Sequence, residues 1–179
     1  MLRLDDTMAV VVDLQERMLP AIHNHEELEK NCVTLIRGLK TLNIPMVITQ
    51  QYTKGLGMTT PAILEAAETE NYYEKASFSA LREENTATAV KEQHRKNVLV
   101  MGIEAHICVL QTCMDLKDRG YHPYLVVDCI GSRLKSSKKM AIKRAIQEGV
   151  KITSYESLLF ELMERSDVEV FRTISKLIK

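Results

Sequence analysis

The stretch Asn97-Val-Leu-Val-Met-Gly-Ile-Glu-Ala-His-Ile-Cys-Val-Leu-Gln-Thr-Cys-Met-Asp-Leu116 contains the clearest change of hydrophobic period in the chain. The apolar run before Gly102 is typical of a buried strand, whereas the spacing of three and four after Cys108 is typical of a helix. Cys108 is therefore predicted at a strand-to-helix turn, near the helix start. The free N–H groups and the dipole of a helix N-terminus favour negative charge. We expect a thiol placed there to ionise below its usual pKa of roughly 8.5 and to serve as a nucleophile.

The same alternation of strands and helices extends outward from this turn in both directions. Predicted strands cover residues 8–13, 45–50, 72–78, 97–101, 122–128 and 150–153. Predicted helices cover residues 28–39, 61–68, 86–93, 108–118, 138–148, 154–163 and 168–178, and the glycines of residues 52–58 indicate a loop. Near-continuous apolar strands that alternate with helices are typical of a parallel sheet covered on both faces. We therefore predict one α/β domain over residues 1–179, a three-layer α/β/α fold with a mostly parallel, Rossmann-like, six-stranded sheet.

The composition excludes several classes of protein. The 24 basic residues balance the 24 acidic ones and neither end is strongly basic, so we expect no nucleic-acid partner. No apolar stretch is long enough for a membrane span, and the Met1–Asp6 start is too polar for a signal peptide. The four cysteines form no C-x-x-C pair, which indicates free thiols and a cytoplasmic location.

Several polar residues fall at or near the carboxyl ends of predicted strands, where open parallel sheets bind ligands. Asp13, Gln50 and Asp128 lie there beside Cys108. Each has a structural alternative: a carboxylate at such a place can cap a helix, and most buried cysteines only pack. Without further information, Lys75 is expected to be a solvated charge on the surface.

The sequence also argues against two kinds of cofactor, a bound nucleotide and a metal ion. No glycine-rich phosphate loop follows the first strand, which disfavours nucleotide binding. The histidines have no metal-binding spacing, although His106 lies close enough to Cys108 to suggest a Cys–His pair. We expect no cofactor and no metal.

Four segments together resemble the isochorismatase-like cysteine hydrolase superfamily, and most closely its isochorismatase domain-containing branch. They are Val11–Gln15, Thr49–Gly57, Glu74–Ser79 and Gly102–Val109, and the segments Asp118–Gly120 and Val126–Arg133 also fit. The resemblance covers nearly the whole chain. It therefore identifies the chain as a single isochorismatase-like hydrolase domain.

The resemblance implies roles that residue type alone leaves open. It makes Asp13, Lys75 and Cys108 a catalytic triad, with a cis peptide between Ile103 and Glu104. It makes the backbone N–H groups of Glu104 and Cys108 the oxyanion hole. The residues that it implies for substrate binding are Gln15, Gln51, Tyr52, Phe78 and Ile103. It also implies a homo-oligomer, a dimer or larger. The apolar stripes of residues 158–163 and 171–178 offer surface for a partner, although part of them must cover the sheet, so only a fraction is free.

Departures from the family pattern narrow the range of possible functions. Nicotinamidases carry metal ligands after the second strand, where this chain has Gln50, Gln51 and Tyr52. Isochorismatases cleave a vinyl ether and need no cysteine nucleophile. Glu104-Ala-His106 replaces the Ala-Thr-Asp common in amidase branches, which alters the pocket floor. These features predict a metal-independent cysteine hydrolase that cleaves a small-molecule amide, imide or ester through a thioester acyl-enzyme.

Two other functions stay open at this point. One is a catalytically silent family member that acts as an oligomeric scaffold or binding protein. The other is a thiol redox sensor, in which Cys113 or Cys129 would resolve an oxidised Cys108.

Overall fold

The central strand is buried at every position. A computed structural model describes all 179 residues and contains this strand as β1 (Thr7–Val12). Ala9 and Val11 belong to one hydrophobic cluster, whereas Val10 and Val12 belong to a second. Because successive side chains of a strand point to opposite faces, the sheet has a core on each side.

All six strands lie parallel in one sheet, in the order β3-β2-β1-β4-β5-β6. The other five strands are β2 (Met46–Gln51), β3 (Tyr73–Lys75), β4 (Asn97–Ile103), β5 (His122–Gly131) and β6 (Lys151–Thr153). The chain winds outward from β1 to β3 and then from β4 to β6, so the winding reverses between β1 and β4. In such sheets a crevice opens at the carboxyl ends of the two strands at the reversal.

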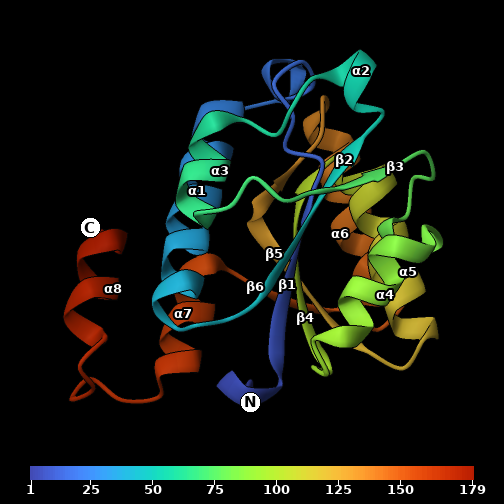
Figure 1. The fold of residues 1–179 in the computed structure, drawn as a ribbon. Coiled ribbons are helices and arrows are strands. Elements are labelled where there is room, and N and C mark those ends of the chain that lie inside the picture. The colour runs from blue at the N-terminus through green and yellow to red at the C-terminus, as the bar shows by residue number, and fades with distance from the viewer.

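Helices cover both faces of the sheet (Figure 1). One layer contains α1 (His25–Thr41), α3 (Pro61–Ala67), α7 (Tyr155–Met163) and α8 (Phe171–Ile178). The other contains α4 (Glu84–Glu92), α5 (Leu110–Asp118) and α6 (Lys135–Gln147). The short α2 (Thr53–Leu56) follows β2, and single turns lie at η1 (Leu4–Asp6), η2 (Leu19–Ala21), η3 (Ala80–Arg82) and η4 (Ala105–Val109). The predicted three-layer α/β/α fold with a six-stranded parallel sheet is confirmed.

Some element boundaries differ from the prediction. α1 and α6 begin three residues before the predicted starts, because their first turns are polar and carry no hydrophobic period. The predicted loop over residues 52–58 contains α2. β5 continues past Asp128 to Gly131 through an irregular register against β4, so Asp128 lies inside a strand and not at its end.

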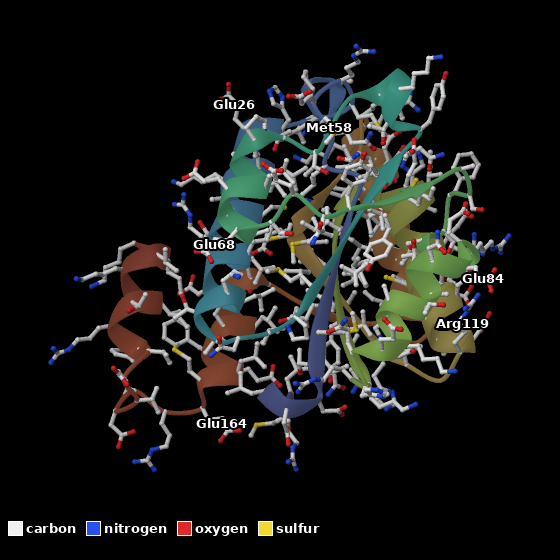
Figure 2. All side chains as sticks on the ribbon, in the orientation of Figure 1. Glu26, Met58, Glu68, Glu84, Arg119 and Glu164 are labelled. Atoms are coloured by element: carbon white, nitrogen blue, oxygen red, sulfur yellow. The ribbon has the colours of Figure 1, made fainter.

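The apolar stripes near the C-terminus are largely used within the chain. Leu158, Leu159, Leu162 and Met163 of α7 are buried in the core, as is Ile174 of α8. All side chains are drawn in Figure 2, where α8 packs along the outside of the α1 and α7 layer. Most of these apolar residues therefore cover the core, as expected, and Phe171, Leu177 and Ile178 remain partly exposed. No helix in the structure has the length and apolar character that a membrane crossing needs.

Candidate active site

Asp13 is the first residue after β1, and its backbone turns there into the left-handed region with φ of 52°. Its N–H donates to the carbonyl of Thr49 on β2, at 3.2 Å, and its own carbonyl accepts from the Gln15 N–H at 2.8 Å. Aspartate tolerates this conformation better than most residues with a Cβ. The turn leaves the carboxylate fully buried at the carboxyl end of the sheet.

The two strands at the winding reversal approach closely at Gly102 of β4. Its φ is 124°, and a Cβ at this position would lie 2.0 Å from the Val12 carbonyl oxygen. Only glycine fits such a contact between backbones. The close approach brings the residues after β1 next to the turn that carries Cys108.

That turn begins at Glu104, and the peptide bond between Ile103 and Glu104 is cis. The Glu104 carbonyl accepts from the N–H groups of Ile107, at 3.0 Å, and Val109, at 3.3 Å, and so starts the π-helical turn η4 that leads into α5. The Glu104 N–H makes no hydrogen bond within the chain. Cys108 lies in η4 with 5% of its surface exposed. The helix therefore begins before Cys108 and not at it.

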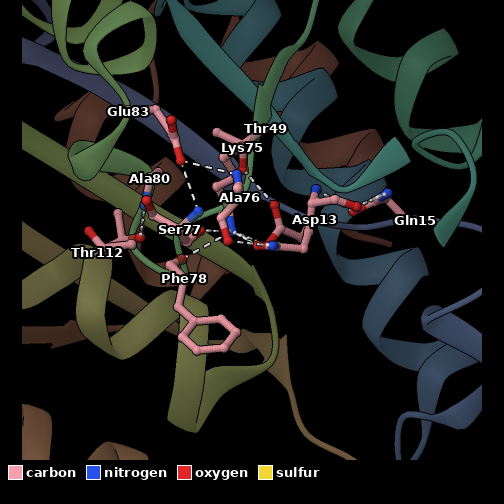
Figure 3. A network of polar contacts seen from close by, with 12 residues as sticks. Asp13, Gln15, Thr49, Lys75, Ala76, Ser77, Phe78, Ala80, Glu83 and Thr112 are labelled. Carbon is pink, nitrogen blue, oxygen red and sulfur yellow. Dashed lines mark hydrogen bonds and ion pairs between the residues drawn. The ribbon is translucent and has the colours of Figure 1, made fainter. Parts of the chain in front are cut away.

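Lys75 ends β3 and forms an ion pair with Asp13, with 2.7 Å between Nζ and Oδ2 and both side chains fully buried. The ammonium also donates to Gln51 Oε1 at 2.6 Å, to the Phe78 carbonyl at 3.0 Å and to the Ser77 carbonyl at 3.1 Å (Figure 3). An ammonium has three hydrogens, and these neutral oxygens can take all of them.

The two carboxylate oxygens of Asp13 therefore differ in their contacts. Oδ1 accepts from the Thr49 hydroxyl at 2.8 Å, whereas Oδ2 has the charge of Lys75 beside it but no directed hydrogen bond from the ammonium. The Cys108 thiol lies close enough to this carboxylate for each group to shift the pKa of the other. Asp13 can therefore accept a proton from Cys108 while Lys75 balances the charge.

The surroundings raise the pKa values of both groups. Burial raises the pKa of Asp13, against the opposing effects of Lys75, Thr49 and Cys108. Burial and then the Asp13 carboxylate raise the pKa of Cys108 to about 12, although Lys75 acts in the other direction. The prediction that this thiol ionises below its usual pKa is wrong. Burial outweighs the helix start, so the resting site holds a protonated thiol beside a base.

Two side chains hold the segment that follows Lys75. Gln51 Nε2 donates to the Ala76 carbonyl at 2.8 Å. The Glu83 carboxylate accepts from the N–H groups of Ala76, at 3.0 Å, and Ser77, at 2.8 Å. Neither Glu83 nor Thr49, which lies beside Asp13, was predicted as a site residue. Thr49 lies inside an apolar strand, where nothing in the sequence distinguishes it from a packing residue. Glu83 lies just before a predicted helix, which indicates at most a capping role.

The residues expected to bind substrate lie in different surroundings. Gln15 is fully buried, where its amide donates to the carbonyls of Gln51 and Gly57 and accepts from the Gln51 N–H. Ile103 packs in the core. Gln15 and Ile103 are therefore structural residues, because the Gln15 amide has no free polar atom and neither side chain is exposed. Tyr52 and Phe78 remain 58% and 56% exposed, and Gln51 contacts Lys75.

Other candidates from the sequence lie outside the triad. Gln50 accepts from the Thr59 N–H and hydroxyl and so fixes the loop after β2. The Asp128 carboxylate accepts from the Tyr155 N–H at the start of α7, and burial raises its pKa. His106 Nδ1 lies 3.0 Å from Ser132 Oγ, so this ring pairs with Ser132 and forms no Cys–His pair. No cluster of His, Cys, Asp or Glu side chains is arranged to hold a metal ion.

The sequence and the fold match known proteins. A family model described as the isochorismatase domain matches residues 7–157. A secreted isochorismatase effector, Isc1, from Phytophthora sojae is 41% identical over 82% of this chain and 71% of its own length. Isochorismatase domain-containing protein 2 from Danio rerio is 31% identical over 96% of this chain and 86% of its own.

Solved structures give the same picture. The structure of a protein described as MAR1 ribonuclease, from Caenorhabditis elegans, is 35% identical, with a TM-score of 0.92, and the match covers 99% of this chain and 91% of that one. The YcaC gene product of Escherichia coli, described as an octameric hydrolase of unknown specificity, is 20% identical with a TM-score of 0.93. That match covers 99% of this chain and 88% of that one, and it shows a shared fold.

Proposed function

The chain belongs to the isochorismatase family, whose members are hydrolases, and on this premise we propose that it is a metal-independent cysteine hydrolase acting on a small amide, imide or ester. The observation that carries the proposal is the buried group formed by Asp13, Lys75 and Cys108. In it, a carboxylate oxygen without a directed donor lies beside a protonated thiol, next to a compensating ammonium.

The first half of the reaction transfers the acyl group to the protein. Asp13 accepts the thiol proton as the sulfur of Cys108 bonds to the carbonyl carbon, so a free thiolate need not accumulate. The backbone N–H groups of Glu104 and Cys108 donate to the resulting oxyanion, each contributing about 3–4 kcal/mol in comparable sites. The oxyanion collapses, the bond to the leaving group breaks, and Asp13 returns its proton to the leaving nitrogen or oxygen.

The second half releases the acid. Asp13 takes a proton from water, the hydroxide oxygen bonds to the thioester carbon, and the carbon–sulfur bond breaks. The sulfur recovers its proton from Asp13, and the carboxylic acid product leaves. Because burial raises the pKa of Asp13, this carboxylate holds a proton more readily than an exposed one and can both accept and return it.

The exposed aromatic rings support a small substrate with an apolar or planar part. Tyr52 follows β2, and Phe78 belongs to the loop that binds the Lys75 ammonium. Figure 3 shows the Phe78 ring pointing away from the polar network, toward the outside of the site. We therefore assign substrate contacts to these rings and to Gln51.

We also propose that the chain forms a homo-oligomer, a dimer or larger, in the cytoplasm. The octameric neighbour from E. coli supports the assembly, and four free cysteines suit a reducing compartment. Light scattering at micromolar concentration tests the first point, and a monomer would contradict it. Cell fractionation tests the second, with the secreted Phytophthora relative as the reason to assay the culture medium as well.

The decisive experiment exposes the protein to a panel of small esters, amides and imides, followed by mass spectrometry of the intact chain. We expect an acyl adduct on Cys108 and turnover of at least one compound. Cys108→Ala should abolish both, whereas Cys113→Ala, which alters a buried cysteine of the neighbouring helix α5, should keep both.

The same experiment separates the alternatives. Absence of adduct and turnover across the panel would favour the silent scaffold. Because the C. elegans neighbour is described as a ribonuclease, RNA belongs in the panel. RNA cleavage that survives Cys108→Ala would overturn the proposed reaction.

A further inference from the structure

Glu104 makes a contact outside the triad that the proposed mechanism does not use. Its carboxylate, which is only 8% exposed, lies 3.0 Å through Oε1 from Arg133 Nε. Oε2 accepts from the Arg133 backbone N–H, also at 3.0 Å. One buried carboxylate thus binds both the side chain and the main chain of a single residue. A buried charge without such partners would be costly, so this contact stabilises the carboxylate in its place.

The two residues follow neighbouring strands of the sheet. Glu104 directly follows β4, and Arg133 lies two residues beyond the end of β5. A second contact, between His106 and Ser132, joins the same two segments. The turn that carries the nucleophile is therefore attached to the chain after β5 at two points.

The backbone of Glu104 is held as well. Its carbonyl accepts from Ile107 and Val109 and so begins the turn that contains Cys108. Its N–H is left without a partner inside the protein. With the side chain fixed on Arg133 and the carbonyl fixed on η4, the direction of this N–H is fixed too.

We infer that Glu104 is a positioning residue, whose carboxylate, anchored on Arg133, aims the Glu104 backbone N–H at the oxyanion. The inference rests on the proposed function and adds to it a role for a side chain that departs from the amidase pattern. An anchored donor has its full effect only when it lies within hydrogen-bond distance of the developing charge. A shift of about 1 Å in such a group can cost on the order of a hundredfold in rate.

The test compares two reactions of the same thiol. Acylation of Cys108 by p-nitrophenyl acetate forms an oxyanion, whereas alkylation by iodoacetamide displaces iodide and forms none. The ratio of the two rates therefore reports on the oxyanion donors. A change that only exposes or hides the thiol moves both rates and leaves the ratio unchanged.

We expect Glu104→Ala to lower this ratio by about tenfold or more, because both contacts to Arg133 are lost. Arg133→Ala keeps the backbone contact and should lower the ratio less, by roughly threefold. Since the Arg133 side chain is 63% exposed, this second variant removes little from the core. Arg82→Ala is the matched control: Arg82 Nε lies 3.0 Å from Asp115, and its side chain is also 63% exposed. It should leave the ratio unchanged.

The outcomes are distinct. If wild type acylates at Cys108 and both Glu104→Ala and Arg133→Ala keep the wild-type ratio, the positioning role is wrong and the proposed function stands. If wild-type Cys108 is alkylated but never acylated, the proposed function fails and the positioning role fails with it. If Glu104→Ala does not fold, the Arg133→Ala ratio decides alone.

Discussion

Lys75 Nζ lies 2.7 Å from Asp13 Oδ2 where neither side chain has any exposed surface. An ion pair so deep in a protein is expensive to form and contributes little net stability compared with apolar residues of the same shape. Its retention in the core is consistent with a chemical role. The pair also makes specific predictions about variants.

Lys75→Met should destabilise the protein by about 3–5 kcal/mol, because Asp13 is then left buried without its counter-charge. Adding Asp13→Asn to this variant should restore part of the loss, since the uncompensated charge is gone. Urea denaturation at pH 7 of wild type, both single variants and the double variant measures the coupling. Strictly additive free energies would show that the two side chains do not interact.

The stability of Lys75→Met should fall as the pH rises. In the wild type, burial already raises the pKa of Asp13 above its unfolded value. A carboxyl group with a raised pKa in the folded state favours folding while it is protonated, below the unfolded pKa, and loses that contribution as the pH rises through the folded pKa. Without Lys75 this pKa rises further, so the loss extends to higher pH. Melting temperatures between pH 4 and pH 8, relative to wild type, measure the effect; a constant difference would contradict it.

Asp13→Asn should separate thiol reactivity from hydrolysis. Because the Asp13 carboxylate raises the pKa of Cys108, its removal lowers that pKa and speeds alkylation by iodoacetamide at pH 8. Turnover should fall by about a hundredfold or more, since the amide cannot accept the proton. Lys75→Ala should shift alkylation the opposite way, toward higher pH. Peptide mapping identifies the labelled cysteine, and preferential labelling of Cys32, Cys113 or Cys129 would refute the placement of Cys108.

Gly102→Ala should prevent stable folding or cost more than about 4 kcal/mol, because the new methyl group would meet the Val12 carbonyl. Gly120→Ala is the matched comparison, as its φ is also positive, at 79°, but no atom lies near the added Cβ. It should cost only about 1–2 kcal/mol, the strain of the backbone conformation alone. Equal losses for the two variants would show that the contact between β1 and β4 is not what requires glycine.

Hydrolysis should survive removal of metal ions. Gln50 and Gln51 end β2 and Tyr52 follows it, and glutamine and tyrosine are poor ligands for zinc or iron. Gln50 and Gln51 are moreover held in hydrogen bonds to Thr59 and Lys75. Dialysis against a strong chelator, followed by metal analysis and assay, checks the expectation. A stoichiometric metal whose removal abolishes turnover would refute it.

The sequence predicted the sheet well because each strand is an apolar run bounded by polar or glycine residues. It predicted boundaries less well where apolar period is absent, as in the polar first turn of α6 and in the irregular part of β5 around Asp128. Register shifts depend on contacts between strands, which no local pattern records.

The candidate site, too, was predicted in part from the sequence and in part not. The resemblance selected Asp13, Lys75 and Cys108, which the structure brings together. The roles of Gln15 and Thr49 depend on which backbone groups lie opposite them, and this was not readable from one sequence. The pKa of Cys108 was misjudged for a related reason. The helix start is visible in the sequence, whereas the depth of burial and the adjoining carboxylate are properties of the folded chain.

Because β1 lies between β2 and β4, the middle of the sheet is incomplete until more than half of the chain has been synthesised. A ribosome that has delivered β3 but not β4 holds a nascent chain with one unpaired edge on β1. On that chain Val10 and Val12 still lack α5 and α6, two of the three helices of the layer on their side of the sheet. Unpaired edges and uncovered apolar faces are what chaperones shield and what aggregation exploits. Between the synthesis of β3 and that of β4, the nascent chain therefore exposes an unpaired strand edge and apolar surface that aggregation can exploit.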